Sequence, residues 1–159
     1  MTVPASQLAV SNMPIARSTP LAGGLSHITF APTPRMSTYL LFFGLGDFER
    51  ASAQVGPTEV GVIAARGKLD QARFALDAGQ AVLREYNDYF GVPYPLPKLD
   101  NIAAPGDNPY FGAMENWGAI FFTFESLLLV DPHLTTQPNA RTYSTPPRTK
   151  SRTNGSAIW

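Results

Sequence analysis

The sequence predicts an α+β fold in which antiparallel strands come first and a helix with further strands follows. Residues 1–66 contain short apolar or β-branched runs separated by glycine and proline, which is typical of strands and turns. At Lys68 the apolar spacing changes to three and four residues, which indicates a helix. Fifteen prolines and thirteen glycines in 159 residues also favour a loop-rich, partly β protein over a helical one.

Four strands are expected before the helix. They are Gln7–Val10, Leu25–Phe30, Thr38–Phe43 and Glu59–Ala65. Four such strands make a poor closed sandwich. We therefore expect residues 1–66 to be the C-terminal strands of a larger antiparallel β domain, with Met1 starting inside it.

The helix is predicted over Leu69–Tyr89 and ends at Gly91, because glycine is the usual residue after a helix C-terminus. Three prolines between residues 93 and 97 require extended backbone, and Lys98–Ala103 can then form a strand. A loop follows at residues 105–109. Ala119–Phe124 is a further strand, and Glu125–Val130 either continues it or forms a short helix. Residues 134–159 are polar and aperiodic, which indicates disorder.

Composition and charge exclude several classes of function. The absence of cysteine excludes a disulfide framework, a thiolate zinc site and a cysteine nucleophile. Equal numbers of acidic and basic residues give no field that would favour nucleic acid as a partner. The sequence shows no signal peptide and no transmembrane segment. The sequence does not identify the cellular compartment. The lack of these two kinds of segment is the one observation that favours the cytoplasm.

One motif carries chemistry, Gly112-Ala113-Met114-Glu115-Asn116, followed by Trp117-Gly118. A glycine permits close approach of another backbone, and the carboxylate of Glu115 stands at the start of a strand. An extended peptide could pair with this edge while Glu115 receives a cation. The alternative is that Glu115 makes an ordinary surface ion pair at a strand entry.

This motif and its surroundings resemble the zinc metalloaminopeptidases of the aminopeptidase N (membrane alanyl aminopeptidase) and leukotriene hydrolase type. The resemblance lies in GAMENWG, in YNDYFGVPYPLPKLDNIAAPG before it and in AIFFTFESLLL after it. TPRMSTYLLFFGLGDFE resembles the end of the β domain that precedes their thermolysin-like catalytic domain. The resemblance covers about residues 30–144. It implies a β domain over residues 1–66 and the N-terminal part of a thermolysin-like peptidase domain over residues 67–144.

The resemblance also implies a substrate-binding set whose partner is the N-terminus of a peptide. Glu115 would bind the free α-amine, which limits such enzymes to removing one residue at a time. Gly112 and Ala113 would contact the peptide backbone, Met114 would line the first side-chain pocket, and Asn116 belongs to the same set.

The zinc centre of this family has no counterpart in the sequence. The family binds Zn²⁺ through HExxH, with a glutamate on the next helix as the third ligand, and a later tyrosine steadies the oxyanion. The two histidines here, His27 and His133, are far apart, and each is more simply a strand or loop residue than a ligand. No catalytic residue and no zinc are therefore expected in this chain, although the intact family uses Zn²⁺.

Residues 145–159 are predicted to be an out-of-frame tail. In relatives the segment after TYS would run into AHEIAHQWFGNL. Written in suitable codons and read from its second nucleotide, that segment becomes RTKSRTNGSAIW, which matches residues 148–159 throughout. The basic residues Arg148, Lys150 and Arg152 then carry no meaning as a nucleic-acid patch.

The resulting functional prediction is a zinc-dependent aminopeptidase sequence that is inactive as this chain, since it lacks HExxH. Two alternatives stay open. One is a catalytically dead module that binds free N-termini. The other is a non-functional fragment that does not fold, because the apolar strand region after the motif lacks its cover.

Overall fold

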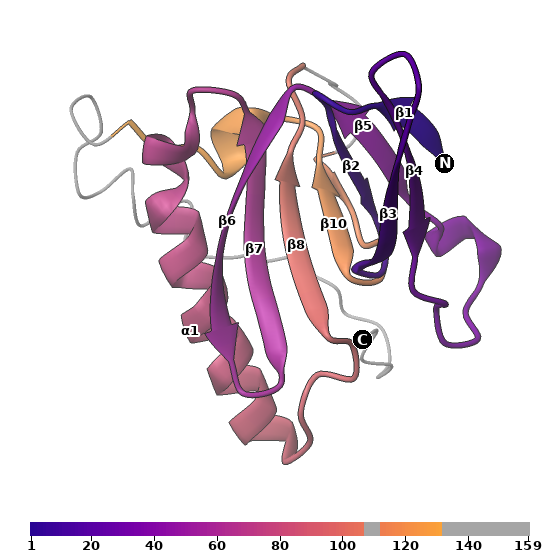
Figure 1. The fold of residues 1–159 in the computed structure, drawn as a ribbon. Helices are drawn as coiled ribbons and strands as arrows, with labels where there is room; N and C mark the ends of the chain where they lie inside the picture. The colour runs from indigo at the N-terminus through magenta and orange to yellow at the C-terminus, as the bar shows by residue number, and fades with distance from the viewer. Residues whose placement is uncertain (107–111, 132–159) are drawn as a thin grey trace.

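The computed structural model describes residues 1–106 and 112–131, and their arrangement is α+β, as predicted (Figure 1). The predicted disordered stretch 134–159, which includes the predicted tail, lies outside the described residues, and so does His133. The strands and the helix are β1 (Thr2–Pro4), β2 (Leu8–Ser11), β3 (Ile15–Leu21), β4 (Leu25–Phe30), β5 (Phe43–Gly46), β6 (Phe48–Val55), β7 (Thr58–Ala65), α1 (Arg73–Phe90), β8 (Lys98–Ala103), β9 (Ala113–Met114) and β10 (Ala119–Phe122).

The strands form three sheets. Strands β1, β4 and β3 make one antiparallel sheet, and β2 pairs antiparallel with β5. The third sheet has five strands in the order β6-β7-β8-β10-β9. Its two central pairs, β7 with β8 and β8 with β10, are parallel, whereas β6 and β9 join the edges antiparallel. This third sheet carries the candidate site.

The five-stranded sheet is covered on both faces, by α1 on one and by the β2–β5 pair on the other (Figure 1). Val62 and Ala64 of β7 pack toward the helix side, while Ile63 between them packs against Val10 of β2. All three β7 side chains are fully buried. Burial on both faces explains why β7 is a continuous apolar run instead of an alternating one.

The predicted helix is confirmed with a small change at its start. A 3-10 turn over Leu69–Ala72 precedes α1, and Gly91 follows the helix with φ of 66°. This left-handed conformation is the reason for glycine at that position. No helix in residues 1–106 or 112–131 is long and apolar enough to span a membrane.

The predicted strand Thr38–Phe43 is wrong. Thr38–Leu40 forms a 3-10 turn, and β5 begins only at Phe43. The reason is a side chain that takes the backbone groups a strand ladder would need. Asn12 donates its Nδ2–H to the carbonyl of Leu40, and its Oδ1 accepts the N–H of Phe42, each at 2.8 Å.

Other strand predictions differ mainly in extent. Leu25–Phe30 and Lys98–Ala103 have the predicted bounds, whereas β10 ends at Phe122 and a 3-10 turn over Glu125–Leu127 follows it. The spacing of apolar residues did not predict β1, β3, β6 or β9. The five-stranded sheet runs across residue 66, where the sequence places a domain division, because β6 and β7 share this sheet with β8.

Candidate functional site

The GAMEN segment, residues 112–116, forms the edge of the five-stranded sheet. Its strand β9 pairs antiparallel with β10, so that Met114 lies opposite Phe121 and Ala113 opposite Phe122. Thr123 donates its backbone N–H to the carbonyl of Gly112 at 3.0 Å. Paired residues in such a ladder alternate in their hydrogen bonding, so the N–H and C=O of Ala113 point away from β10. The outer edge of β9 therefore presents backbone groups to a further strand.

Gly112 is held at the entry to this edge but is not required by the packing around it. The Thr123 hydroxyl also donates to the Gly112 carbonyl, at 3.1 Å. A methyl group placed on Gly112 would meet only the Leu127 Cδ1 atom, at an ordinary contact distance of 3.7 Å. The described part of the fold thus leaves room above this glycine.

The side chains of residues 114–116 differ in burial. Glu115 is exposed, Met114 is half-buried, and Asn116 is buried. Among the residues that the structure describes, Glu115 forms no salt bridge. The carboxylate therefore stands directly after the described edge strand and has no described cation as a salt-bridge partner.

Asn116 faces the interior of the protein. Its Nδ2–H donates to the carbonyl of Leu40 at 3.2 Å, and its own carbonyl accepts the N–H of Ala119 at 3.0 Å. It belongs to the predicted substrate-binding set, but these contacts hold the segment against residues 38–42. Asn116 therefore supports the backbone next to Glu115.

A second buried asparagine contributes to the same support. Asn12, which follows β2, is only 1% exposed and donates its Nδ2–H to the carbonyls of Leu40 and Trp117, both at 2.8 Å. Sequence reasoning missed this residue, because a single asparagine between two strands has no distinguishing pattern. The structure brings it to the GAMEN segment from 105 positions away.

Gly118 closes the turn after the motif and needs to be glycine. Its φ is 69°, and a methyl group there would collide with the carbonyl oxygen of Asn12. Its N–H donates to the hydroxyl of Tyr94 at 3.2 Å, and burial raises the pKa of that tyrosine. Its carbonyl accepts from the Lys98 ammonium at 2.6 Å.

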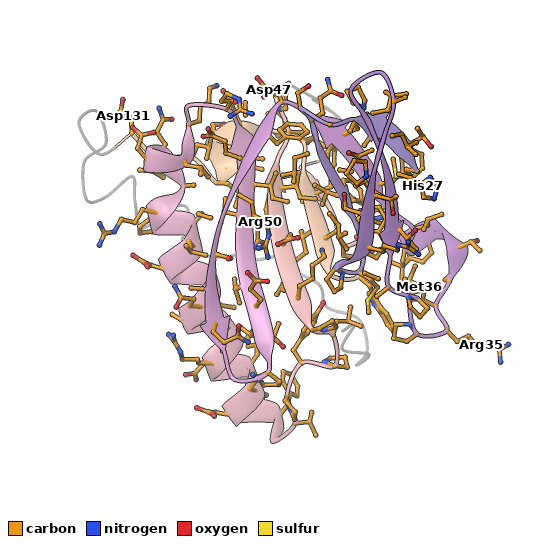
Figure 2. All side chains as sticks on the ribbon, viewed as in Figure 1. His27, Arg35, Met36, Asp47, Arg50 and Asp131 are labelled. Atoms are coloured by element: carbon orange, nitrogen blue, oxygen red, sulfur yellow. The ribbon has the colours of Figure 1, made fainter. Side chains whose placement is uncertain are left out.

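A chain of charged side chains, buried at Lys98 and Asp100, extends from this carbonyl into the sheet. Lys98 also pairs with Asp100 at 2.8 Å, and Arg50 connects Asp100 to Glu59, again with 2.8 Å contacts (Figure 2 labels Arg50). Burial lowers the pKa of Lys98, against the opposing effect of Asp100, and the hydrogen bond from Arg50 lowers the pKa of Glu59. Gly61 makes room for this chain, since a methyl group there would collide with the Asp100 carboxylate.

The described residues provide no metal site. Within residues 1–106 and 112–131, no three His, Asp or Glu side chains lie close enough to share a metal ion. His27 is exposed on β4, and its Nδ1 lies 3.2 Å from the hydroxyl of Thr2 (Figure 2). The part of the chain that the structure describes therefore does not fit the zinc that the resemblance implies.

Comparison with known proteins identifies the class as peptidases. The sequence model described as "Peptidase family M1 domain" matches residues 74–145, and "Peptidase M1 N-terminal domain" matches residues 1–40. The GAMEN segment falls within the first match. The chain belongs to the M1 aminopeptidase family.

Individual relatives agree with this assignment. The chain is 46% identical over 132 residues to aminopeptidase N of Acetobacter pasteurianus, covering 83% of this chain and 37% of that protein. It is 44% identical over 135 residues to probable aminopeptidase 2 of Sulfurisphaera tokodaii, covering 85% and 17%. It is 46% identical over 125 residues to human endoplasmic reticulum aminopeptidase 1, covering 78% and 13%. The chain thus spans about a third or less of the length of these relatives.

Proposed function

We propose that this chain carries the part of an aminopeptidase that recognises the free N-terminus of a peptide. The observation that carries the proposal is the exposed carboxylate of Glu115, without a described salt-bridge partner, directly after an edge strand with outward-facing backbone groups. In this proposal the first peptide residue pairs with the Ala113 backbone. Its ammonium group donates to Glu115.

The chemistry of the two groups supports this arrangement. An ammonium has three N–H donors and no acceptor, and a carboxylate accepts up to four hydrogen bonds, so the two match in charge and in number. Main-chain pairing along β9 would fix the direction of the peptide and tolerate different side chains. Met114, half-buried beside this edge, is proposed to contact the first side chain. The ligand class is therefore peptides with a free α-amine.

A binding experiment with matched ligands tests the role of Glu115. Trialanine amide and its N-acetylated form are titrated into the ¹⁵N-labelled chain, and affinity is measured from backbone chemical shifts. We expect the free amine to bind several-fold more tightly, and Glu115→Gln to abolish this difference by removing the negative charge. Glu85→Gln, an equivalent change at an exposed position on α1, is the control and should leave the difference intact.

Two outcomes would contradict the proposed role of Glu115. Equal affinity of the free and acetylated peptides for the unmodified chain would remove the proposal. So would a preference for the free amine that survives Glu115→Gln.

We further propose that the chain alone does not hydrolyse peptides. HExxH is absent from the sequence, so the paired histidines and the glutamate that would hold and use a zinc-bound water are missing. We expect elemental analysis of the purified chain to find far less than one zinc per molecule. We also expect no hydrolysis of alanine anilide, with or without added Zn²⁺. Stoichiometric zinc together with turnover would contradict this proposal.

The reading-frame hypothesis for residues 145–159 stays a proposal as well. It is supported by the codon match described above and by the family match, which ends at residue 145. DNA sequencing across the codon for Thr145 is the test. If the shifted frame after that codon does not encode HExxH, the proposal is wrong.

A further inference from the structure

The hydrogen bonds of Asn12 single it out among the buried polar side chains of the described residues. Both Nδ2–H groups are used, for the carbonyls of Leu40 and Trp117, and Oδ1 accepts the N–H of Phe42, all at 2.8 Å. A fully satisfied amide at 1% exposure is rigidly held, because any rotation leaves a buried polar group unpaired. Asn12 thus joins residues 40–42 to the backbone two positions beyond Glu115.

We propose that Asn12 is a positioning residue for Glu115, holding the backbone from which that carboxylate meets the ligand's ammonium. This inference rests on the proposed function, since it assigns a residue that supports the same site. Asn12 touches no ligand in this account. It acts through the carbonyl of Trp117 and the segment behind it.

The backbone on both sides of Glu115 is held by hydrogen bonds. Before Glu115, the backbone is held by the hydrogen bonds from Thr123 to Gly112. After Glu115, it is held by Asn12 at Trp117. Glu115 has no salt bridge to a described residue, so its direction depends on these backbone anchors.

Neighbouring contacts hold the same backbone as Asn12 and therefore limit how much of its position depends on Asn12 alone. Asn116 donates to the same Leu40 carbonyl as Asn12, and Gly118 packs its Cα against the Asn12 carbonyl. Lys98 holds the Gly118 carbonyl independently of Asn12. Loss of the Asn12 amide should therefore loosen the GAMEN segment without releasing it.

The variants Asn12→Ala and Asn12→Asp test the inference. Alanine removes all three hydrogen bonds, and aspartate keeps the shape and the acceptor for Phe42 while losing both donors. We expect each to lower the preference for free over acetylated trialanine amide about twofold without abolishing it, which is the effect of a weak net hydrogen bond. Measurements are made well below the melting temperature of each variant.

A matched control separates positioning from general destabilisation. Asn101 on β8 is half-buried and donates to the Gly61 carbonyl at 3.4 Å, away from the GAMEN segment. Asn101→Ala should lower the melting temperature while leaving the preference for the free amine unchanged. In the Glu115→Gln background, the Asn12 substitutions should have no further effect on that preference, because Asn12 acts through Glu115.

The outcomes distinguish this inference from the proposed function. If Glu115→Gln has no effect on amine preference, the proposed function fails. If Glu115→Gln abolishes the preference but folded Asn12 variants keep it, only the inference is overturned. Should neither Asn12 variant fold, backbone relaxation of the unmodified chain decides. An order parameter near 0.85 at Glu115 supports positioning, and one below about 0.6 overturns it.

Discussion

Gly112 is a residue where the requirements of folding and of the proposed binding differ. Its backbone does not adopt a left-handed conformation, and a methyl group would make only an ordinary contact with Leu127. Nothing in the described fold therefore demands glycine there. In the proposed function, glycine at this position leaves room for an approaching peptide.

Gly112→Ala should separate these two requirements. We expect the free energy of unfolding to change by less than about 0.5 kcal/mol, as for surface substitutions without strain. Binding of free-amine trialanine amide should weaken, because the added methyl occupies the space above the edge. Urea unfolding and the chemical-shift titration measure the two effects. Unchanged binding would show that the space is not used.

Single residues also show where prediction from sequence ends. The sequence predicts Glu115 at the start of a strand, because a carboxylate beside a glycine and a strand is a local signal, and the structure places it between β9 and β10. Asn12 and the Lys98–Asp100 pair could not be predicted as part of the site. Their contacts arise only when distant strands come together.

At the scale of elements, α1 was the most predictable part of the chain. Its three- and four-residue spacing and the glycine after it are properties of the segment itself. The region 38–43 was not predictable for the opposite reason, since the Asn12 side chain decides its conformation. Strand β6 was missed because its alanine, serine and glutamine residues have little strand preference, and it forms by pairing with the buried β7.

The end of α1 permits a quantitative prediction. Gly91 has φ of 66°, and a methyl group there would meet no neighbouring atom. The cost of Gly91→Ala is then conformational alone, about 1–2 kcal/mol of unfolding free energy. Gly91→Asn should cost less, because asparagine tolerates the left-handed region better. Urea unfolding monitored by circular dichroism gives both values, and equal costs would contradict the conformational explanation.

At the scale of the whole molecule, the described structure exposes large apolar side chains around β5. Tyr39, Leu41 and Phe43 are 55%, 58% and 69% exposed. Apolar surface of this kind favours association between molecules.

We expect the chain to self-associate as its concentration rises. Phe43→Lys should raise the concentration at which it stays monomeric, by replacing the most exposed of these side chains with a charge. Ser18→Lys adds the same charge on exposed β3 and is the control. Sedimentation velocity of the three proteins is the measurement. An equal gain from both substitutions would assign the effect to net charge alone.

The long connection between Asn12 and Trp117 has a consequence for synthesis on the ribosome. The amide that anchors the GAMEN segment is made early, but the carbonyl it binds is made 105 residues later. Strands β1, β3 and β4 pair with one another soon after they emerge, whereas β2 has to wait for β5. The GAMEN edge has to wait for almost every described residue. A ribosome that stops before Trp117 has emerged would leave Asn12 with an unpaired donor and no ordered edge for a peptide. The proposed recognition of an N-terminus would then be among the last properties the nascent chain acquires.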